Sequence, residues 1–238
     1  MKNKSVIITG ASKGIGRDLS LHFAKLGYNL LLISRDEKLL DSLYSQIKSF
    51  ANQQFISILA SDVLDQEKIA DNISKFHAKT SSIDVLINNA GYVKRGTSDL
   101  DHMELTQMVN TNLIGAVNMV RIVSPIMTKQ SNGYIINMCS RNAKTPRAFL
   151  GGYAATKAAL AGYSDSLYKE LKNTGVKVTS LFPGFVDTQM TAEVNAKRSD
   201  LIPTDDICKL LDFLLSMSSS SSIKELSLES KIQIGEFF

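Results

Sequence analysis

Cysteine is scarce in this chain of 238 residues, in which Cys139 and Cys208 are the only two. They lie far apart, and neither belongs to a Cys-x-x-Cys pair or has histidine-rich neighbours. The sequence therefore predicts neither a disulfide framework nor a metal site. We expect both cysteines to be buried and to take no part in the chemistry.

Long hydrophobic runs and basic blocks are missing as well. No apolar run approaches the ~20 residues that cross a bilayer, and residues 1–5 lead into a strand-like run too short for a signal peptide. We therefore expect a cytoplasmic protein with no membrane partner. The net charge of +4 is spread along the chain without Lys/Arg blocks, which argues against nucleic acid as a partner. A modest basic excess suits an anionic cofactor.

Short apolar runs alternate with longer segments of helical periodicity. A hydrophobic content of 44% allows a full core, and we expect one domain over residues 1–238. Nearly continuous apolar strands that alternate with helices predict an α/β fold with a doubly wound parallel sheet and helices on both faces. The expected strands are 5–9, 29–34, 54–59, 85–88, 133–139, 177–182 and, more weakly, 225–234. The expected helices are 14–26, 37–50, 66–79, 102–127, 152–173 and 204–216.

A glycine-rich turn separates the first strand from the first helix. Its spacing is Gly-x-x-x-Gly-x-Gly, and such glycines permit positive φ angles and close approach of a ligand to the backbone. The N-terminus of the following helix offers free N–H groups to a pyrophosphate. The alternative is a purely structural turn that joins the strand to the helix and binds no ligand. The residues predicted here to bind the cofactor are Gly10, Ser12, Lys13, Gly14, Ile15 and Gly16.

The end of the second expected strand indicates which cofactor is bound. Ser34 and Arg35 stand where a carboxylate would accept the ribose 2′-hydroxyl of NAD. With no carboxylate at Ser34, and with Lys13 also close, a 2′-phosphate would be attracted, so we predict NADP (NADPH). Arg35 as a solvated turn residue is the alternative. Asp62 and Val63 are predicted near the adenine, although an aspartate there also suits a helix cap.

Tyr153 and Lys157 form the candidate catalytic pair. The spacing Tyr-x-x-x-Lys occurs three times, at Tyr44/Lys48, Tyr153/Lys157 and Tyr168/Lys172. Only Tyr153 has a serine thirteen residues earlier, Ser140, at the end of an apolar strand. On one helix face, the charge of Lys157 is expected to lower the pKa of the Tyr153 phenol from ~10 toward neutrality, where it exchanges protons efficiently.

Other interpretations of these residues remain open. Tyr153 also suits the edge of a core, Lys157 a solvated helix face, and Ser140 the cap of a turn. A Ser140–Lys157 nucleophile is a further reading, but the sequence lacks a nucleophile-elbow turn. In that case the glycine-rich turn would have no role.

Taken in order, these motifs resemble the signature of the short-chain dehydrogenase/reductase family. The resemblance runs from about residue 5 to residue 190 and comprises residues 9–16, Asn88-Asn89-Ala90-Gly91, Asn112, Ser140, Tyr153, Lys157 and Pro183-Gly184. It implies a Rossmann-like fold. It further implies that Tyr153 donates a proton to a substrate carbonyl as hydride arrives, that Ser140 holds the same oxygen, and that Lys157 bonds the nicotinamide ribose.

The resemblance assigns further residues to the site. Asn112 would complete a proton relay through a water near Lys157, and it is preferred over Asn110 because Asn-Leu-Ile-Gly matches the family pattern better. For Asn89, a structural role that ties neighbouring strands is as plausible as direct contact. The remaining expected cofactor contacts are Asn89, Ala90, Gly91, Pro183, Gly184, Val186 and Thr188.

The substrate is predicted only as a class. The resemblance implies a small-molecule carbonyl or alcohol, reduced with NADPH. The alternatives are an NAD-linked alcohol dehydrogenase and a non-catalytic NADP-binding sensor or scaffold. Residues 191–201 are expected to form a short lid, and the resemblance implies a homodimer or homotetramer, a dimer using the helices after Met103 and Gly152. Candidate substrate contacts are Tyr92, Val93, Arg141, Phe149, Phe185 and Met190.

Overall fold

Seven parallel strands form one sheet in the computed structural model, which describes residues 4–51 and 53–234. Along the sheet the order is β3-β2-β1-β4-β5-β6-β7, with every neighbouring pair parallel. The strands are β1 (Ser5–Thr9), β2 (Asn29–Ser34), β3 (Ile56–Ala60), β4 (Val85–Asn88), β5 (Gly133–Met138), β6 (Val176–Pro183) and β7 (Glu225–Leu228). The predicted doubly wound parallel sheet is confirmed.

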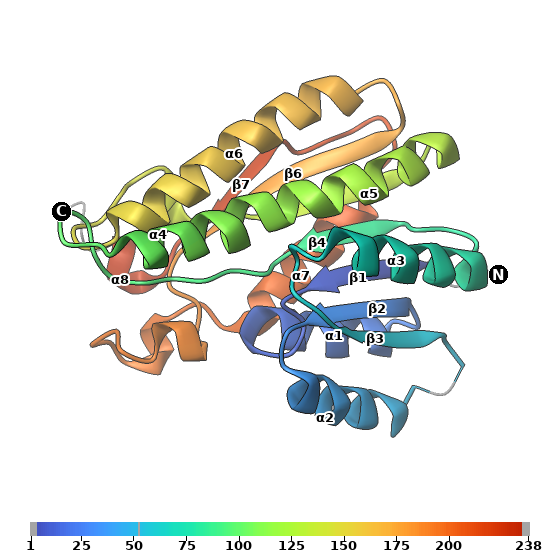
Figure 1. The fold of residues 1–238 in the computed structure, drawn as a ribbon, viewed down its shortest axis with the longest axis horizontal. Coiled ribbons are helices and arrows are strands. Elements are labelled where there is room, and N and C mark those ends of the chain that lie inside the picture. Colours follow the sequence, from blue (N-terminus) through green and yellow to red (C-terminus); the bar gives the residue numbers. More distant parts are fainter. Residues whose placement is uncertain (1–3, 52, 235–238) are drawn as a thin grey trace.

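Helices cover both faces of this sheet (Figure 1). One core lies between the strands and α1, α2 and α7, and the other lies between the strands and α3, α5 and α6. The helices are α1 (Gly14–Lys25), α2 (Glu37–Lys48), α3 (Gln66–Thr80), α4 (His102–Val109), α5 (Gly115–Gln130), α6 (Gly151–Leu171), α7 (Thr204–Ser216) and the short α8 (Lys231–Ile234). Burial of both faces explains why the strands are almost uniformly apolar.

Two predicted elements are corrected. The expected helix 102–127 is interrupted by a π-helical turn, η1 (Asn110–Ile114), which coincides with the buried Asn112. The expected strand 225–234 ends at Leu228, and residues 231–234 are helical. The alternation of apolar residues breaks at Ser230, and β6 offers no further partner because Pro183, which pairs with Leu228, is its last residue.

Both cysteines are buried, as predicted. Within the described residues no helix is long and apolar enough to cross a membrane.

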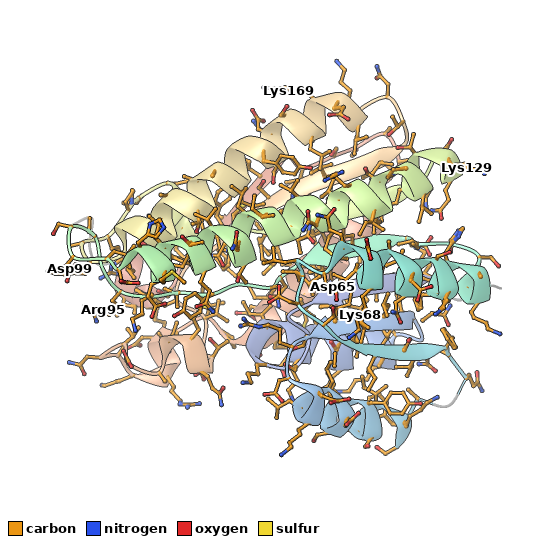
Figure 2. The ribbon with its side chains drawn as sticks, in the orientation of Figure 1. Asp65, Lys68, Arg95, Asp99, Lys129 and Lys169 are labelled. Carbon is orange, nitrogen blue, oxygen red and sulfur yellow. The ribbon has the colours of Figure 1, made fainter. Side chains whose placement is uncertain are left out.

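Parallel strands bring the loops that follow them to one end of the sheet. Figure 2 shows Arg95 and Asp99 at this end, in the loop between β4 and α4, whereas Lys129 lies at the opposite end, near the last turn of α5. Strands β1 to β3 are added toward one edge of the sheet and β4 to β7 toward the other, so the strand order reverses between the neighbours β1 and β4. Open α/β sheets bind ligands in the crevice that this reversal creates.

Buried amides connect the central strands to α6. Asn88 Nδ2 donates to Asn137 Oδ1 at 2.8 Å, and Asn137 Nδ2 donates to Ser164 Oγ at 2.7 Å. Asn137 is fully buried, between β4 and α6. These bonds hold the helix that carries Tyr153 against the centre of the sheet.

Replacing Asn137 by alanine is expected to lower the free energy of unfolding by about 2 kcal/mol, because two buried polar partners lose their hydrogen bonds. Urea denaturation measures the change. Asn132→Ala is the control, since that side chain is exposed and makes one bond of 3.4 Å to Asp84. Equal stability of the two variants would contradict a structural role for the buried network.

Candidate functional site

A cleft of about 750 Å³ opens at the carboxyl ends of the strands, at the β1/β4 crevice. Most of the predicted cofactor residues line it, including Asp62, Val63 and Ser34. Its walls are formed by Gly10, Ser12, Lys13, Gly14, Ile15, Ile33, Ser34, Arg35, Asp36, Ser61, Asp62, Val63, Asn89, Ala90, Gly91, Tyr92, Val93, Thr111, Thr188, Gln189 and Met190. Five residues of these walls were not predicted from the sequence: Ile33, Asp36, Ser61, Thr111 and Gln189. Their positions directly beside predicted residues were the available signal.

The glycine-rich turn requires its glycines. Gly10 and Gly14 have φ angles of +64° and +49°, which side chains rarely adopt. A Cβ on Gly16 would lie 2.2 Å from the carbonyl oxygen of Gly10. Gly16 does not line the cleft, so its role is to let α1 begin directly beneath the turn.

The N-terminus of α1 is left open to an anion. Helices α2, α3 and α4 begin after Asp36, Asp65 and Asp101, each of which accepts a backbone hydrogen bond. Helix α1 follows Lys13, and among the described residues no side chain caps it and no acidic residue stands in its first turn. Free N–H groups and the positive end of the helix dipole are therefore available in the cleft.

Two cations and two carboxylates surround the outer end of the cleft. Lys13 Nζ lies 3.4 Å from Asp36, and Arg35 Nη1 lies 3.9 Å from Asp62. All four side chains are substantially exposed, so these pairs hold the cations weakly. Ser12 and Ser34 share a hydrogen bond of 2.7 Å beside them.

Asn89 holds the two halves of the crevice together. Its Nδ2 donates to the carbonyl oxygens of Thr9 and Gly10, at 3.0 and 3.2 Å. The Thr9 hydroxyl accepts from the backbone N–H groups of Asn89 and Ala90, both at 3.0 Å. The structure thus shows a structural role for Asn89, which also lines the cleft together with its neighbours Ala90 and Gly91.

The predicted residues after β6 divide into two groups. Thr188 lines the cleft, and its Cγ2 would lie 3.2 Å from a Cβ on Gly14. Val186 is buried and forms a parallel bridge with Ile202, and Gly184 donates its N–H to Leu228. Pro183, Gly184 and Val186 therefore support the wall and do not line the cleft.

Tyr153, Ser140 and Lys157 come together beside this cleft. Tyr153 and Lys157 project from α6, and Ser140 follows β5. A hydrogen bond connects Ser140 to the Tyr153 phenol. The Lys157 ammonium lies 5.9 Å from the centre of the Tyr153 ring and donates to Met138 O at 2.7 Å. The arrangement brings the Ser140 hydroxyl, the Tyr153 phenol and the Lys157 ammonium close together.

Asn112 faces Lys157 across Gly91. A Cβ on Gly91 would lie 3.6 Å from Asn112 Oδ1 and 3.7 Å from Lys157 Nζ. The Asn112 amide accepts from Tyr92 N at 2.7 Å and donates to Tyr92 O at 2.8 Å. Its Nδ2 also bonds Thr156 Oγ1 at 3.0 Å. These bonds fix the loop that forms the cleft wall.

The predicted lowering of the Tyr153 pKa is wrong for this structure. Burial raises the pKa of Tyr153 to about 12, although the bond to Ser140 acts in the opposite direction. Burial also lowers the pKa of Lys157 to about 8. Desolvation disfavours both charged forms and is the largest cause of each pKa shift, and it outweighs the effect of the neighbouring charge. The Tyr153 phenol is therefore protonated at neutral pH.

The spacing of the pair alone does not mark the site. Lys48 Nζ lies 5.8 Å from the centre of the Tyr44 ring on α2, almost the same separation as in Tyr153/Lys157. The context of Ser140 and the cleft distinguishes one pair from the other.

The candidate substrate contacts are only partly brought together. Tyr92, Val93 and Met190 line the cleft. Phe149 is 62% exposed. The Arg147 guanidinium carbon lies 4.8 Å from the centre of the Phe185 ring. Arg141 is corrected: it is buried and donates to Glu229 at 2.8 Å, so its charge is used within the protein.

Comparison with known proteins agrees with the geometry. The family model for short chain dehydrogenases matches residues 4–199. A 3-oxoacyl-[acyl-carrier-protein] reductase of Staphylococcus epidermidis is 32% identical over 203 residues, which cover 84% of this chain and 80% of that protein. The chain belongs to the short-chain dehydrogenase/reductase family, and it is an oxidoreductase of that family.

Two solved structures share the whole fold. A betaketoacyl-[ACP] reductase from Bacteroides thetaiotaomicron is 33% identical, with a TM-score of 0.85, and the match covers 98% of this chain and 99% of that one. A metagenomic short-chain oxidoreductase in complex with NADP is 26% identical, with a TM-score of 0.81 and coverage of 95% and 96%. The open helix N-terminus and the glycine cradle fit the nicotinamide dinucleotide that this family binds.

Burial of Lys157 predicts a pH-dependent stability. Its pKa is about 8 in the folded protein and 10.5 in the unfolded chain, so between these values the unfolded state binds more protons. The free energy of unfolding should therefore rise by about 2–3 kcal/mol from pH 8 to pH 10.5 relative to Lys157→Met.

Urea denaturation of the two proteins across this range measures the difference. Subtracting the variant removes the contribution of other titrating groups, including the Tyr153 phenol. If the difference in the free energy of unfolding between the two proteins stays constant across this pH range, the pKa of Lys157 is not lowered in the folded protein.

Proposed function

We propose that the protein reduces a ketone or aldehyde to an alcohol with NADPH, and that Tyr153 donates the proton. The observation that carries the proposal is the meeting of the half-buried Tyr153 with the buried Ser140 and Lys157 beside a cleft suited to a dinucleotide. The similarity of the chain to 3-oxoacyl reductases supports a 3-oxoacyl compound or another small carbonyl as substrate.

Each catalytic residue has a distinct task in this proposal. Bound NADPH would supply hydride. Tyr153, protonated because burial raises its pKa, gives its proton to the carbonyl oxygen, and the Ser140 hydroxyl donates a hydrogen bond to the same oxygen. Lys157, held by Met138 O, stabilises the phenolate left behind. Asn112 keeps the wall opposite Lys157 in place.

Preference for NADPH over NADH rests on Arg35 and Lys13. Both line the outer cleft, and the polar residue at the end of β2 is Ser34, which carries no charge. A 2′-phosphate would compete with Asp36 and Asp62 for these cations, and a phosphate accepts more charge-assisted hydrogen bonds than a carboxylate. The NADP complex of the metagenomic relative supports the same choice.

Tyr153→Phe is expected to lower kcat for carbonyl reduction by at least ~100-fold, because the proton donor is lost. Oxidation of NADPH is followed at 340 nm with a panel of ketones and aldehydes. Tyr168→Phe is the matched control, since it lies on the same helix and has the same spacing to a lysine. The assigned mechanism is refuted if Tyr153→Phe turns over as fast as the control.

Arg35→Ala is expected to raise the Kd for NADPH roughly 10- to 100-fold, because a charge-assisted contact with the 2′-phosphate is lost. The Kd for NADH should stay within about twofold, because NADH has no such phosphate. Fluorescence titration of the reduced cofactors measures both constants. Arg17→Ala serves as the control, because Arg17 lies on α1 and bonds Gln46 on α2. An unchanged ratio of the two constants would remove the reason to propose NADPH.

A further inference from the structure

A buried arginine forms an ion pair with an exposed glutamate next to the proposed catalytic serine. Arg141, which follows Ser140 directly, is 6% exposed, and its Nε donates to Glu229 Oε1 at 2.8 Å. We propose that Arg141 and Glu229 are positioning residues that fix the Ser140 hydroxyl against Tyr153. This inference rests on the proposed function and adds to it two residues that neither touch the reacting atoms nor line the cleft.

The turn that holds Ser140 is closed mainly by its own bonds. Ser140 caps the 3-10 turn η2 (Arg141–Ala143), and its Oγ accepts from Asn142 N at 3.2 Å. Ala143 N donates to Ser140 O at 2.9 Å. These bonds set the shape of the turn but not its distance from α6, where Tyr153 lies. Before Ser140, the bonds from Lys157 to Met138 O and from Cys139 N to Leu181 O hold the end of β5. After Ser140, an anchor outside the turn would hold the other side of the Ser140–Tyr153 contact.

Glu229 supplies that anchor from the edge of the sheet. It follows β7, whose last residue, Leu228, pairs with Pro183 and accepts from Gly184 N at 2.7 Å. In the sheet β6 lies between β5 and β7, so the ion pair bridges the ends of two strands that are roughly 10 Å apart. A long, planar arginine can span this distance and fix the orientation of the turn.

The burial of Arg141 indicates a positional role. Removing its charge from water offsets much of the attraction to Glu229, so the pair contributes little net stability. A second ion pair, between Lys144 and Glu225 at 2.5 Å, connects the same turn to the same strand, but the Lys144 side chain is 42% exposed, whereas that of Arg141 is 8% exposed. The Lys144–Glu225 pair therefore provides a control for the Arg141–Glu229 pair.

The experiment compares kcat for carbonyl reduction and the Kd for NADPH in a set of variants. Arg141→Met and Glu229→Leu remove the pair and should each lower kcat about tenfold or more, since small displacements of a catalytic group are costly. The Kd for NADPH should stay within about twofold, because neither residue lines the cleft. Glu229→Gln keeps an acceptor oxygen and should retain more of kcat than Glu229→Leu.

The same changes made in Ser140→Ala separate positioning from general damage. If Arg141 acts through the Ser140 hydroxyl, Arg141→Met should change kcat less than about twofold once that hydroxyl is gone. The control, Glu225→Gln, should leave kcat at the wild-type value. Should Arg141→Met fail to fold, the comparison of Glu229→Gln with Glu229→Leu decides the question.

The inference is overturned if the folded variants reduce carbonyls at the wild-type rate, or if they lose the same factor with and without Ser140. Failure of the proposed function has a different signature. It would be seen in the wild-type protein, which would then oxidise no NADPH with any carbonyl of the panel.

Discussion

The hydrogen bonds between Asn89 and the Thr9–Gly10 backbone are the constraint on which the site depends. They join the loops after β1 and β4 where the sheet changes direction, and they leave room for α1 only because Gly16 has no side chain. The cofactor cradle and the wall that carries Gly91 are thereby fixed to each other. The cleft is consequently present in the folded chain itself.

Burial governs the chemistry at the other end of the cleft. The same desolvation that raises the pKa of the Tyr153 phenol lowers the pKa of Lys157, so burial disfavours the charged form of each group. The bond from Lys157 to Met138 O holds the ammonium in place. A negative charge that develops at Tyr153 during proton donation would favour the charged form of Lys157. Perturbed pKa values of this kind cluster at functional sites.

The sequence predicted the sheet, most of the residues that line the cleft, and the grouping of Ser140, Tyr153 and Lys157, because each depends on local patterns. Apolar strands, the glycine spacing and the context of Ser140 are readable without tertiary structure. The predictions failed where contacts with residues distant in the sequence determine the structure. Pro183 ends the pairing of β7, and Glu229 takes the charge of Arg141 that was expected to face a substrate. Desolvation of Tyr153 likewise depends on the whole surrounding fold. The oligomeric state and the lid over residues 191–201 stay predictions.

A crystal structure of the protein with NADPH and a trapped carbonyl or alcohol ligand tests the central claim most directly. The account predicts the pyrophosphate at the N-terminus of α1, the 2′-phosphate beside Arg35, and the ligand oxygen within hydrogen-bond distance of both Tyr153 and Ser140. A ligand oxygen bound away from these two hydroxyls, with the cofactor in the cleft, would contradict it.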